Sequence, residues 1–145
     1  MAQNPAHKLF INDLQMCKKS SEDTWELNLK VPKLPNVMKV IPFTLIWIQG
    51  YIEQVVGKEN EILILNDKTG KVKISGCNTV PGGSSWVSEG KYCSVVGSLT
   101  KVCALPEVCA LKLTDLSENK ILTLLWPKEV EELKLLILEQ AMPKL

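Results

Sequence analysis

The sequence predicts a small, mainly β Greek-key barrel that ends in a C-terminal α-helix. Five or six short apolar segments, separated by turn residues, have the alternation or the β-branched content of strands. A glycine interrupts the longest of these segments, which indicates a bent strand. The last segment changes to the spacing of a helix. This pattern by itself leaves several small barrel folds open.

Residues 1–42 are predicted to form an N-terminal extension with the first strand elements. The apolar residues of Asn4–Cys17 fit either a short strand or a turn of helix. Thr24–Val31 alternates between apolar and polar side chains, which is typical of a half-buried strand. The prolines at positions 32, 35 and 42 then predict an extended connection.

Residues 43–116 are predicted to form the barrel. Its first strand, Phe43–Val56, contains Gly50, where we expect a bulge or a sharp bend. Turn residues 66–70 predict a hairpin between Ile62–Leu65 and Val72–Ile74.

The second half of the barrel begins with a predicted loop. Cys77–Gly90 is rich in Gly, Ser and Pro, and it has room for one helical turn around Trp86 and Val87. Two further strands are expected, Lys91–Val102 and Cys109–Leu113.

The segment 127–141 is predicted to form an interface helix, from about Pro127 to Gln140. Proline suits a first helical position. Four apolar side chains share one face of this helix: Val130, Leu133, Leu136 and Ile137. Leu135 and Leu138 lie roughly 100 to 180° away from that face. Because one barrel covers only one side of a helix, we expect a partner helix or groove to bury the other side.

Size and charge limit the function. The 145 residues fit one domain, 1–145, and 46% apolar content can fill its core. The formal net charge is only +1, so the chain lacks the long-range field that attracts nucleic acids. All 17 basic residues are lysines, which removes the guanidinium fork favoured for phosphate and guanine recognition.

The sequence favours neither an enzyme nor a metal protein. The five cysteines have no zinc-knuckle or redox spacing, and we expect reduced, mostly buried thiols. His7 is the only histidine, so a nucleophile with a histidine base has little support. Gly82 and Gly83 fit a turn better than a phosphate-binding loop. We expect no catalytic residue, no metal and no cofactor.

The chain has no apolar leader segment near residues 1–8, and its longest apolar region, Val40–Ile52, is too short to cross a bilayer. A soluble protein of a reducing, intracellular compartment is therefore expected.

Three segments carry a resemblance to a known family. They are Trp47-Ile48-Gln49-Gly50, the stretch Gly90–Gly97 and the stretch Cys109–Asn119, which is followed by Trp126. With these residues, the chain resembles the RecQ-mediated genome instability protein 2 family. The resemblance is clear from about Phe43 to Trp126 and fainter before that.

The resemblance implies an oligonucleotide/oligosaccharide-binding (OB) fold, a five-stranded Greek-key barrel, and a nuclear, non-catalytic subunit. It implies pairing with the C-terminal OB domain of RecQ-mediated genome instability protein 1. A Bloom-type RecQ helicase and topoisomerase III alpha complete the implied complex, which dissolves double Holliday junctions. It also implies that a composite groove binds a peptide of the Fanconi anaemia group M helicase.

The resemblance also implies partner-binding residues. Lys112 and Trp126 match positions at the partner interface, and Lys8 and Trp47 match positions near the groove for the repair helicase. The helical pattern adds Val130, Leu133 and Ile137 as candidates for the partner face. The alternatives are that Trp126 plugs the barrel, that Trp47 is a core residue and that Lys112 is a solvated lysine.

The competing hypothesis is an OB module that binds single-stranded nucleic acid by itself. Such modules usually carry aromatic side chains on their second and third strands for base stacking. The corresponding strands here carry Ile, Leu and Val, so we expect little or no direct DNA binding.

Overall fold

The computed structural model describes residues 6–31 and 33–141. The η elements are short 3-10 helices. In chain order the elements are β1 (His7–Lys8), η1 (Ile11–Met16), β2 (Cys17–Lys19), β3 (Trp25–Val31), β4 (Leu34–Phe43), β5 (Ile46–Val56), η2 (Lys58–Asn60), β6 (Ile62–Asn66), β7 (Lys71–Ser75), η3 (Cys77–Thr79), β8 (Tyr92–Lys101), β9 (Glu107–Asp115) and α1 (Lys120–Ala141).

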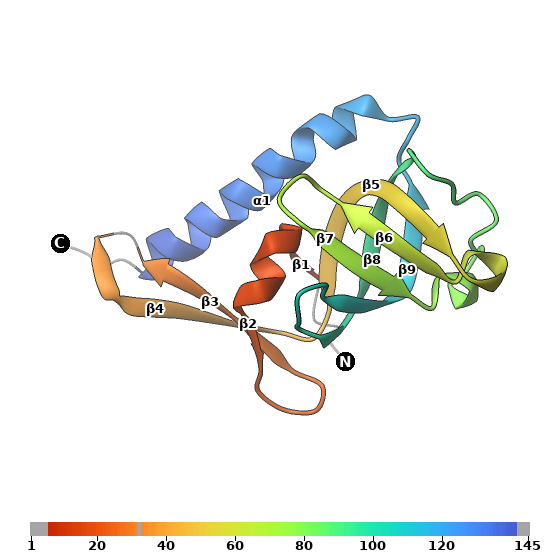
Figure 1. Cartoon of the computed structure of the whole chain (residues 1–145). Coiled ribbons are helices and arrows are strands. Elements are labelled where there is room, and N and C mark those ends of the chain that lie inside the picture. The colour runs from red at the N-terminus through yellow and green to blue at the C-terminus, as the bar shows by residue number, and fades with distance from the viewer. Residues whose placement is uncertain (1–5, 32, 142–145) are drawn as a thin grey trace.

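Five of the strands close into a barrel, as expected. The long strand β5 pairs with β6 through its second half and with β8 through its first half. The circle is completed by β6–β7, β7–β9 and β8–β9, of which only β7–β9 is parallel. Figure 1 shows β5 curving around the barrel. This arrangement confirms the predicted fold class, a mainly β barrel with a C-terminal helix.

The period-2 pattern of the strands places apolar side chains inside the barrel. On β6 and β7, the inward residues Leu63, Leu65, Val72 and Ile74 are each fully buried. Gly50 lies where β5 passes close to β6, and a Cβ atom there would stand 2.8 Å from the carbonyl oxygen of Asn66. The irregularity in the β5–β6 register falls later, between Ile52 and Gln54.

The predicted extended connection after β3 is instead a strand. β4 pairs antiparallel with β3 in a three-stranded sheet of order β2–β3–β4, so it is an edge strand. Proline has no backbone N–H to donate. In an edge strand this is tolerated where the position of the missing N–H faces solvent and not the neighbouring strand. Pro35 and Pro42 are therefore accommodated inside β4, while Pro32 lies outside the described residues.

The C-terminal helix begins earlier than Pro127. α1 starts at Lys120, and the side chain of Asn119 accepts a hydrogen bond from the N–H of Leu122 at 3.2 Å, as an N-cap does. Pro127 therefore lies inside the helix, where it costs about 3 kcal/mol because the carbonyl of residue 123 loses its usual donor. The two buried side chains that flank the proline, Trp126 and Val130, offset this cost.

Two of the leucines on α1 have exchanged the positions expected from the sequence. Leu136 is expected to share a face with Val130, Leu133 and Ile137 but is 58% exposed, whereas Leu138, expected on another side of the helix, packs against the core. The reason is that the buried face of α1 is centred on Trp126 and Val130, and Trp126 precedes the predicted start of the helix at Pro127.

The loop after β7 also differs in detail. Its helical turn is η3, Cys77–Thr79, at the start of the loop rather than around Trp86. Trp86 packs against the core, and Trp25 is buried, as expected for packing residues.

Candidate partner interface

A cluster of aromatic and charged side chains attaches α1 to the barrel. Trp126 is 2% exposed, and its ring lies 5.5 Å from the ring of Trp47, centre to centre, at an angle of 41°. The ammonium of Lys8 lies 4.9 Å from the centre of the Trp47 ring and 3.8 Å from the carboxylate of Glu129. The structure thus brings together three residues predicted from the sequence, Lys8, Trp47 and Trp126.

The fold explains how this cluster forms. β1 pairs in parallel with β5, and this register sets Lys8 beside Trp47. Trp47 is half-buried, and its indole N–H donates a 2.6 Å hydrogen bond to the hydroxyl of Ser94 on the neighbouring strand β8. The hydrogen bond to Ser94 therefore fixes the Trp47 ring, and Trp126 and Lys8 pack against the ring.

The indole N–H of Trp126 is enclosed and has no acceptor among the described residues. An unsatisfied buried donor costs about 1–3 kcal/mol. Trp126 is held there by its apolar contacts and not by a hydrogen bond.

A second attachment holds the C-terminal half of α1. The ammonium of Lys134 lies 2.7 Å from the carboxylate of Asp13 and 4.9 Å from the centre of the Phe10 ring. Asp13 is 1% exposed, and its carboxylate also accepts a 2.8 Å hydrogen bond from the backbone N–H of Phe10. Because removing one partner from a buried ion pair is costly, this contact fixes the helix against η1.

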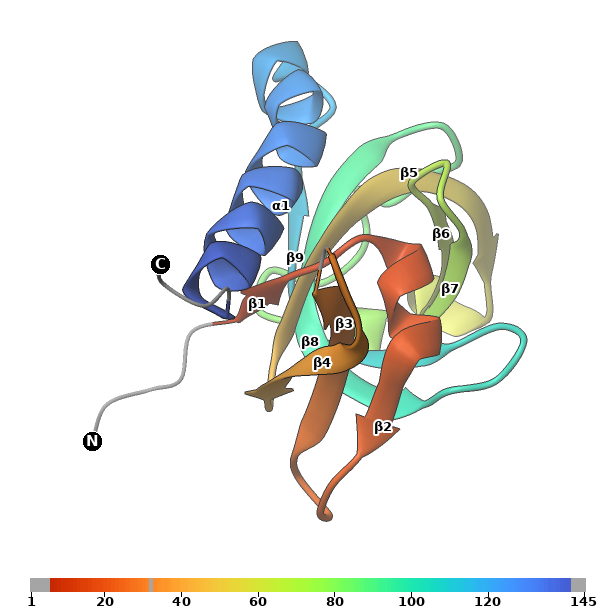
Figure 2. The same ribbon diagram turned by 90° about the vertical axis from the view of Figure 1, so that its left-hand side faces the viewer.

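The outer face of α1 carries an unusual amount of exposed apolar surface. Six large side chains are 39% to 73% exposed: Ile121, Leu122, Leu124, Leu125, Leu135 and Leu136. At about 100° per residue, Ile121, Leu124 and Leu135 lie roughly 140 to 180° from Trp126. Figure 2 shows the first turns of α1 standing beyond the barrel. Leu122, Leu125 and Leu136 lie nearer to Trp126, at about 40 to 100° from it, and we call all six exposed residues the α1 outer face.

Charged residues divide the α1 outer face into two parts. Lys128, Glu131 and Glu132 are exposed in the middle of the helix. Four apolar residues lie before them and two after them. The surplus of apolar surface expected for this helix is therefore present, and much of it lies in the first turns.

Lys112 lies on the outside of the barrel, one strand away from β5. Trp47 pairs with Val96, and Val96 pairs with Lys112, so the three side chains form a row across β5, β8 and β9. Lys112 is exposed, and beside it Leu111 is 50% exposed at a register irregularity in the β8–β9 pair.

The helical candidates from the sequence face their own chain to different degrees. Val130 is fully buried, and Leu133 and Ile137 are half-buried. In the isolated chain, Trp126 and Val130 offer almost no surface to another protein. Their assignment to a partner interface stays a proposal.

Sequence reasoning missed the apolar residues of the first two helical turns. Asn119 is a good N-cap residue, and an apolar run follows it directly. That pattern was a usable sign that the helix starts at Lys120.

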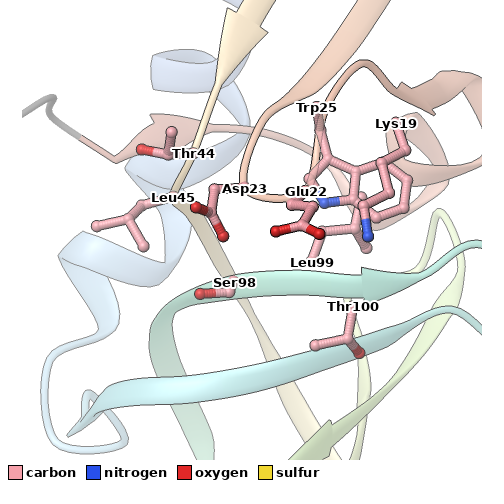
Figure 3. A pocket seen from close by; sticks show the side chains of 9 residues that line it. All are labelled: Lys19, Glu22, Asp23, Trp25, Thr44, Leu45, Ser98, Leu99 and Thr100. Atoms are coloured by element: carbon pink, nitrogen blue, oxygen red, sulfur yellow. The ribbon is translucent and has the colours of Figure 1, made fainter.

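A separate pocket of about 390 Å³ lies between the β2–β3 turn and β8 (Figure 3). The acidic side chains of Glu22 and Asp23 reach it from the turn, and Lys19 lies over the ring of Trp25 at 5.9 Å. Among the described residues, no three His, Cys, Asp or Glu side chains are grouped to hold a metal ion.

The outer surface of β6 and β7 is the place where an OB module would present stacking aromatics. Its lysines are engaged with acidic residues: Lys71 lies 2.7 Å from Glu53, and Lys73 lies 3.1 Å from Glu107. These ion pairs reduce the positive charge that this surface offers to phosphate groups.

Within the part of the chain that the structure describes, no helix is long and apolar enough to cross a membrane.

Comparisons with known proteins identify a family. The family model for RecQ-mediated genome instability protein 2 matches residues 5–134. A curated protein of that name from Gallus gallus is 31% identical over 133 residues, which cover 91% of this chain and 93% of the relative. Its counterpart in Mus musculus is 30% identical over 132 residues, covering 89% of this chain and 82% of the relative.

Solved structures support the fold. A chain in the crystal structure of the S. pombe Stn1–Ten1 complex has a TM-score of 0.73 at 15% identity, covering 94% of this chain and 96% of that one. A chain of a replication protein A heterotrimer bound to single-stranded DNA has a TM-score of 0.62 at 10% identity, covering 92% and 98%.

Proposed function

This chain belongs to the RecQ-mediated genome instability protein 2 family, and we propose that it is a non-catalytic structural subunit of a RecQ helicase complex. In this proposal it pairs with the C-terminal OB domain of RecQ-mediated genome instability protein 1. Through that pair it joins a Bloom-type RecQ helicase and topoisomerase III alpha in the nucleus, where the complex dissolves double Holliday junctions.

The observation that carries the proposal is the α1 outer face. Single exposed apolar residues are ordinary, but four in the first two turns of one helix, with two more near its C-terminal end, give apolar surface of the kind that marks protein–protein contact. Ile121, Leu124 and Leu135 lie on the side of α1 that is opposite Trp126, so their surface is available to another chain. A helix or groove of the partner is the surface that would cover it.

Other parts of the chain are assigned smaller roles. Lys112 is proposed to contact the partner through its ammonium, which fixes orientation more than affinity. Trp126, Val130, Leu133 and Ile137 are proposed to belong to the partner interface, to which the buried Trp126 and Val130 contribute by holding α1 in place. Lys8 and Trp47 are proposed to line the composite groove for the Fanconi anaemia group M helicase peptide.

The test is co-purification with the C-terminal OB domain of the partner. We expect Leu124→Glu and Leu135→Glu each to abolish or strongly weaken pairing, because each places a charge in an apolar contact. Val56→Glu is the matched control, since Val56 is 42% exposed but lies on β5. Circular dichroism checks that all three variants are folded. Normal pairing by both leucine variants would exclude the α1 outer face as the interface.

A further inference from the structure

A second surface, away from the α1 outer face, has an open sheet edge. β4 is ten residues long and, among the described residues, pairs only with β3, because it lies at one end of the β2–β3–β4 sheet. Figure 1 shows the β3–β4 hairpin extending away from the barrel. A long edge strand offers a row of unpaired backbone groups to any extended chain that can reach it.

The direction of these backbone groups follows from the strand register. The N–H of Ser20 donates to the carbonyl of Thr24 at 2.9 Å, so Thr24 turns its backbone groups toward β2. Successive residues of a strand turn theirs to opposite sides, so Leu27 and Leu29 face β4. Their partners Ile41 and Lys39 therefore face β3.

The residues in between must then face the open edge. These are Met38 and Val40, and also Pro42, whose missing N–H is not needed for pairing with β3. The presence of a proline at one of the outward positions agrees with this assignment. The register with β3 is regular over residues 38–43 and shifts between Lys30 and Val31, so the open window runs over residues 38–41, up to Pro42.

Three apolar side chains in and beside this window are exposed. Val37, Met38 and Val40 are 43%, 45% and 42% exposed. Natural proteins usually protect such an edge with charges, proline or a covering element. Here Pro42 protects one end and the register shift protects the other, and residues 38–41 between them are left open to strand addition.

The charge around the hairpin indicates what kind of chain can bind. Lys30 and Lys33 are exposed and Lys39 is half-buried, and none of the three forms an ion pair within the described part of the chain. The acidic residues Glu22 and Asp23 lie in the β2–β3 turn, which is at the other end of the sheet. An acidic segment would complement these lysines.

We propose that β4 binds an extended, acidic peptide segment of a partner protein as an added strand. The backbone groups of Met38 and Val40 pair with the peptide. The exposed apolar side chains of the window contact its alternate residues, and Lys30, Lys33 and Lys39 attract its carboxylates. This surface is separate from the α1 outer face, so its occupation does not depend on the proposed function.

The test measures the binding of a fluorescein-labelled octapeptide of alternating Glu and Val to the full chain by fluorescence anisotropy. We expect the Glu–Val octapeptide to bind saturably. A Lys–Val octapeptide should bind at least tenfold more weakly. The same Glu–Val peptide with N-methylated backbone should also bind at least tenfold more weakly, because it cannot pair with a strand.

Variants of the chain locate the site. Val40→Pro removes one outward N–H, as Pro42 already does, and should weaken binding at least tenfold. Lys30→Glu combined with Lys33→Glu should weaken it similarly, while Lys58→Glu, on η2, is the control and should leave it unchanged. Since Val40→Pro could disturb β4, the N-methylated peptide tests strand addition on the native chain.

Three results would overturn the proposal. One is equal binding of the normal and N-methylated peptides, and another is equal binding of the Glu–Val and Lys–Val peptides. The third is a dimer of the isolated chain in sedimentation that Val40→Pro abolishes, because it would assign the edge to a second copy.

Discussion

Replacing Trp126 with alanine tests whether one indole holds α1 to the barrel. A tryptophan buries about 150–250 Å², which at about 25 cal/mol/Å² corresponds to about 4–6 kcal/mol. Part of this surface is already sheltered in the unfolded chain, which lowers the value by about 10–40%. The unsatisfied indole N–H lowers it by about 1–3 kcal/mol more. With the cavity that is left, we expect Trp126→Ala to reduce the free energy of unfolding by about 3 kcal/mol.

Trp126→Phe is the informative control. Phenylalanine keeps an aromatic ring over Trp47 but has no N–H to leave unsatisfied. The loss of contact area and the removal of the unsatisfied donor oppose each other. We therefore expect Trp126→Phe to change the free energy of unfolding by no more than about 1 kcal/mol.

Urea unfolding of the isolated chain, followed by circular dichroism, measures both values. The reasoning fails if Trp126→Ala costs less than about 1 kcal/mol, because a ring that is 2% exposed would then contribute almost nothing. It also fails if Trp126→Phe costs as much as Trp126→Ala, because the indole N–H would then have a partner.

Three further predictions concern other buried groups. Lys134→Met leaves the buried carboxylate of Asp13 without its cation. The free energy of unfolding, measured in urea, should fall by about 3–5 kcal/mol. A loss below about 1 kcal/mol would contradict a fixed ion pair. Burial raises the pKa of the Cys77 and Cys93 thiols to about 12. Iodoacetamide at pH 8 should therefore label these two thiols only after the chain unfolds. Equal labelling rates with and without urea would contradict this. Burial lowers the pKa of His7 below its ordinary 6.5, with Lys134 adding to the effect and Asp13 opposing it. The unfolded chain therefore takes up this proton first, so stability should fall as pH drops below about 6.5, and the urea midpoint of His7→Gln should depend less on pH.

The strands with a clean alternating pattern were predictable from the sequence. Trp25–Val31 alternates because one face is buried and the other is not, and the hairpin strands β6 and β7 were predictable from the turn residues 66–70 between two apolar runs. β4 was not predictable in the same way, since its prolines are compatible with a strand only at an edge. Whether a strand lies at an edge depends on the whole sheet and not on its own residues.

Two local patterns in the sequence predict different starts for α1. Pro127 suits a first helical position, and Asn119 suits an N-cap. The burial of Trp126 decides for Asn119, because the indole reaches Trp47 only if the helix already includes residue 126. Trp47 and Trp126 lie 79 residues apart in the sequence, so no local pattern contains their contact.

The inner contacts of α1 determine what its outer face can do. Trp126 on Trp47, Lys134 on Asp13 and Lys8 on Glu129 fix the helix in the isolated chain, so a partner does not have to order it. Because ordering a segment on binding reduces affinity, a helix that is already docked presents its apolar side chains at a lower entropic cost. It follows that inner-face and outer-face variants differ in kind: Trp126→Ala should lower stability and pairing together, whereas Leu124→Glu should lower pairing and leave stability nearly unchanged.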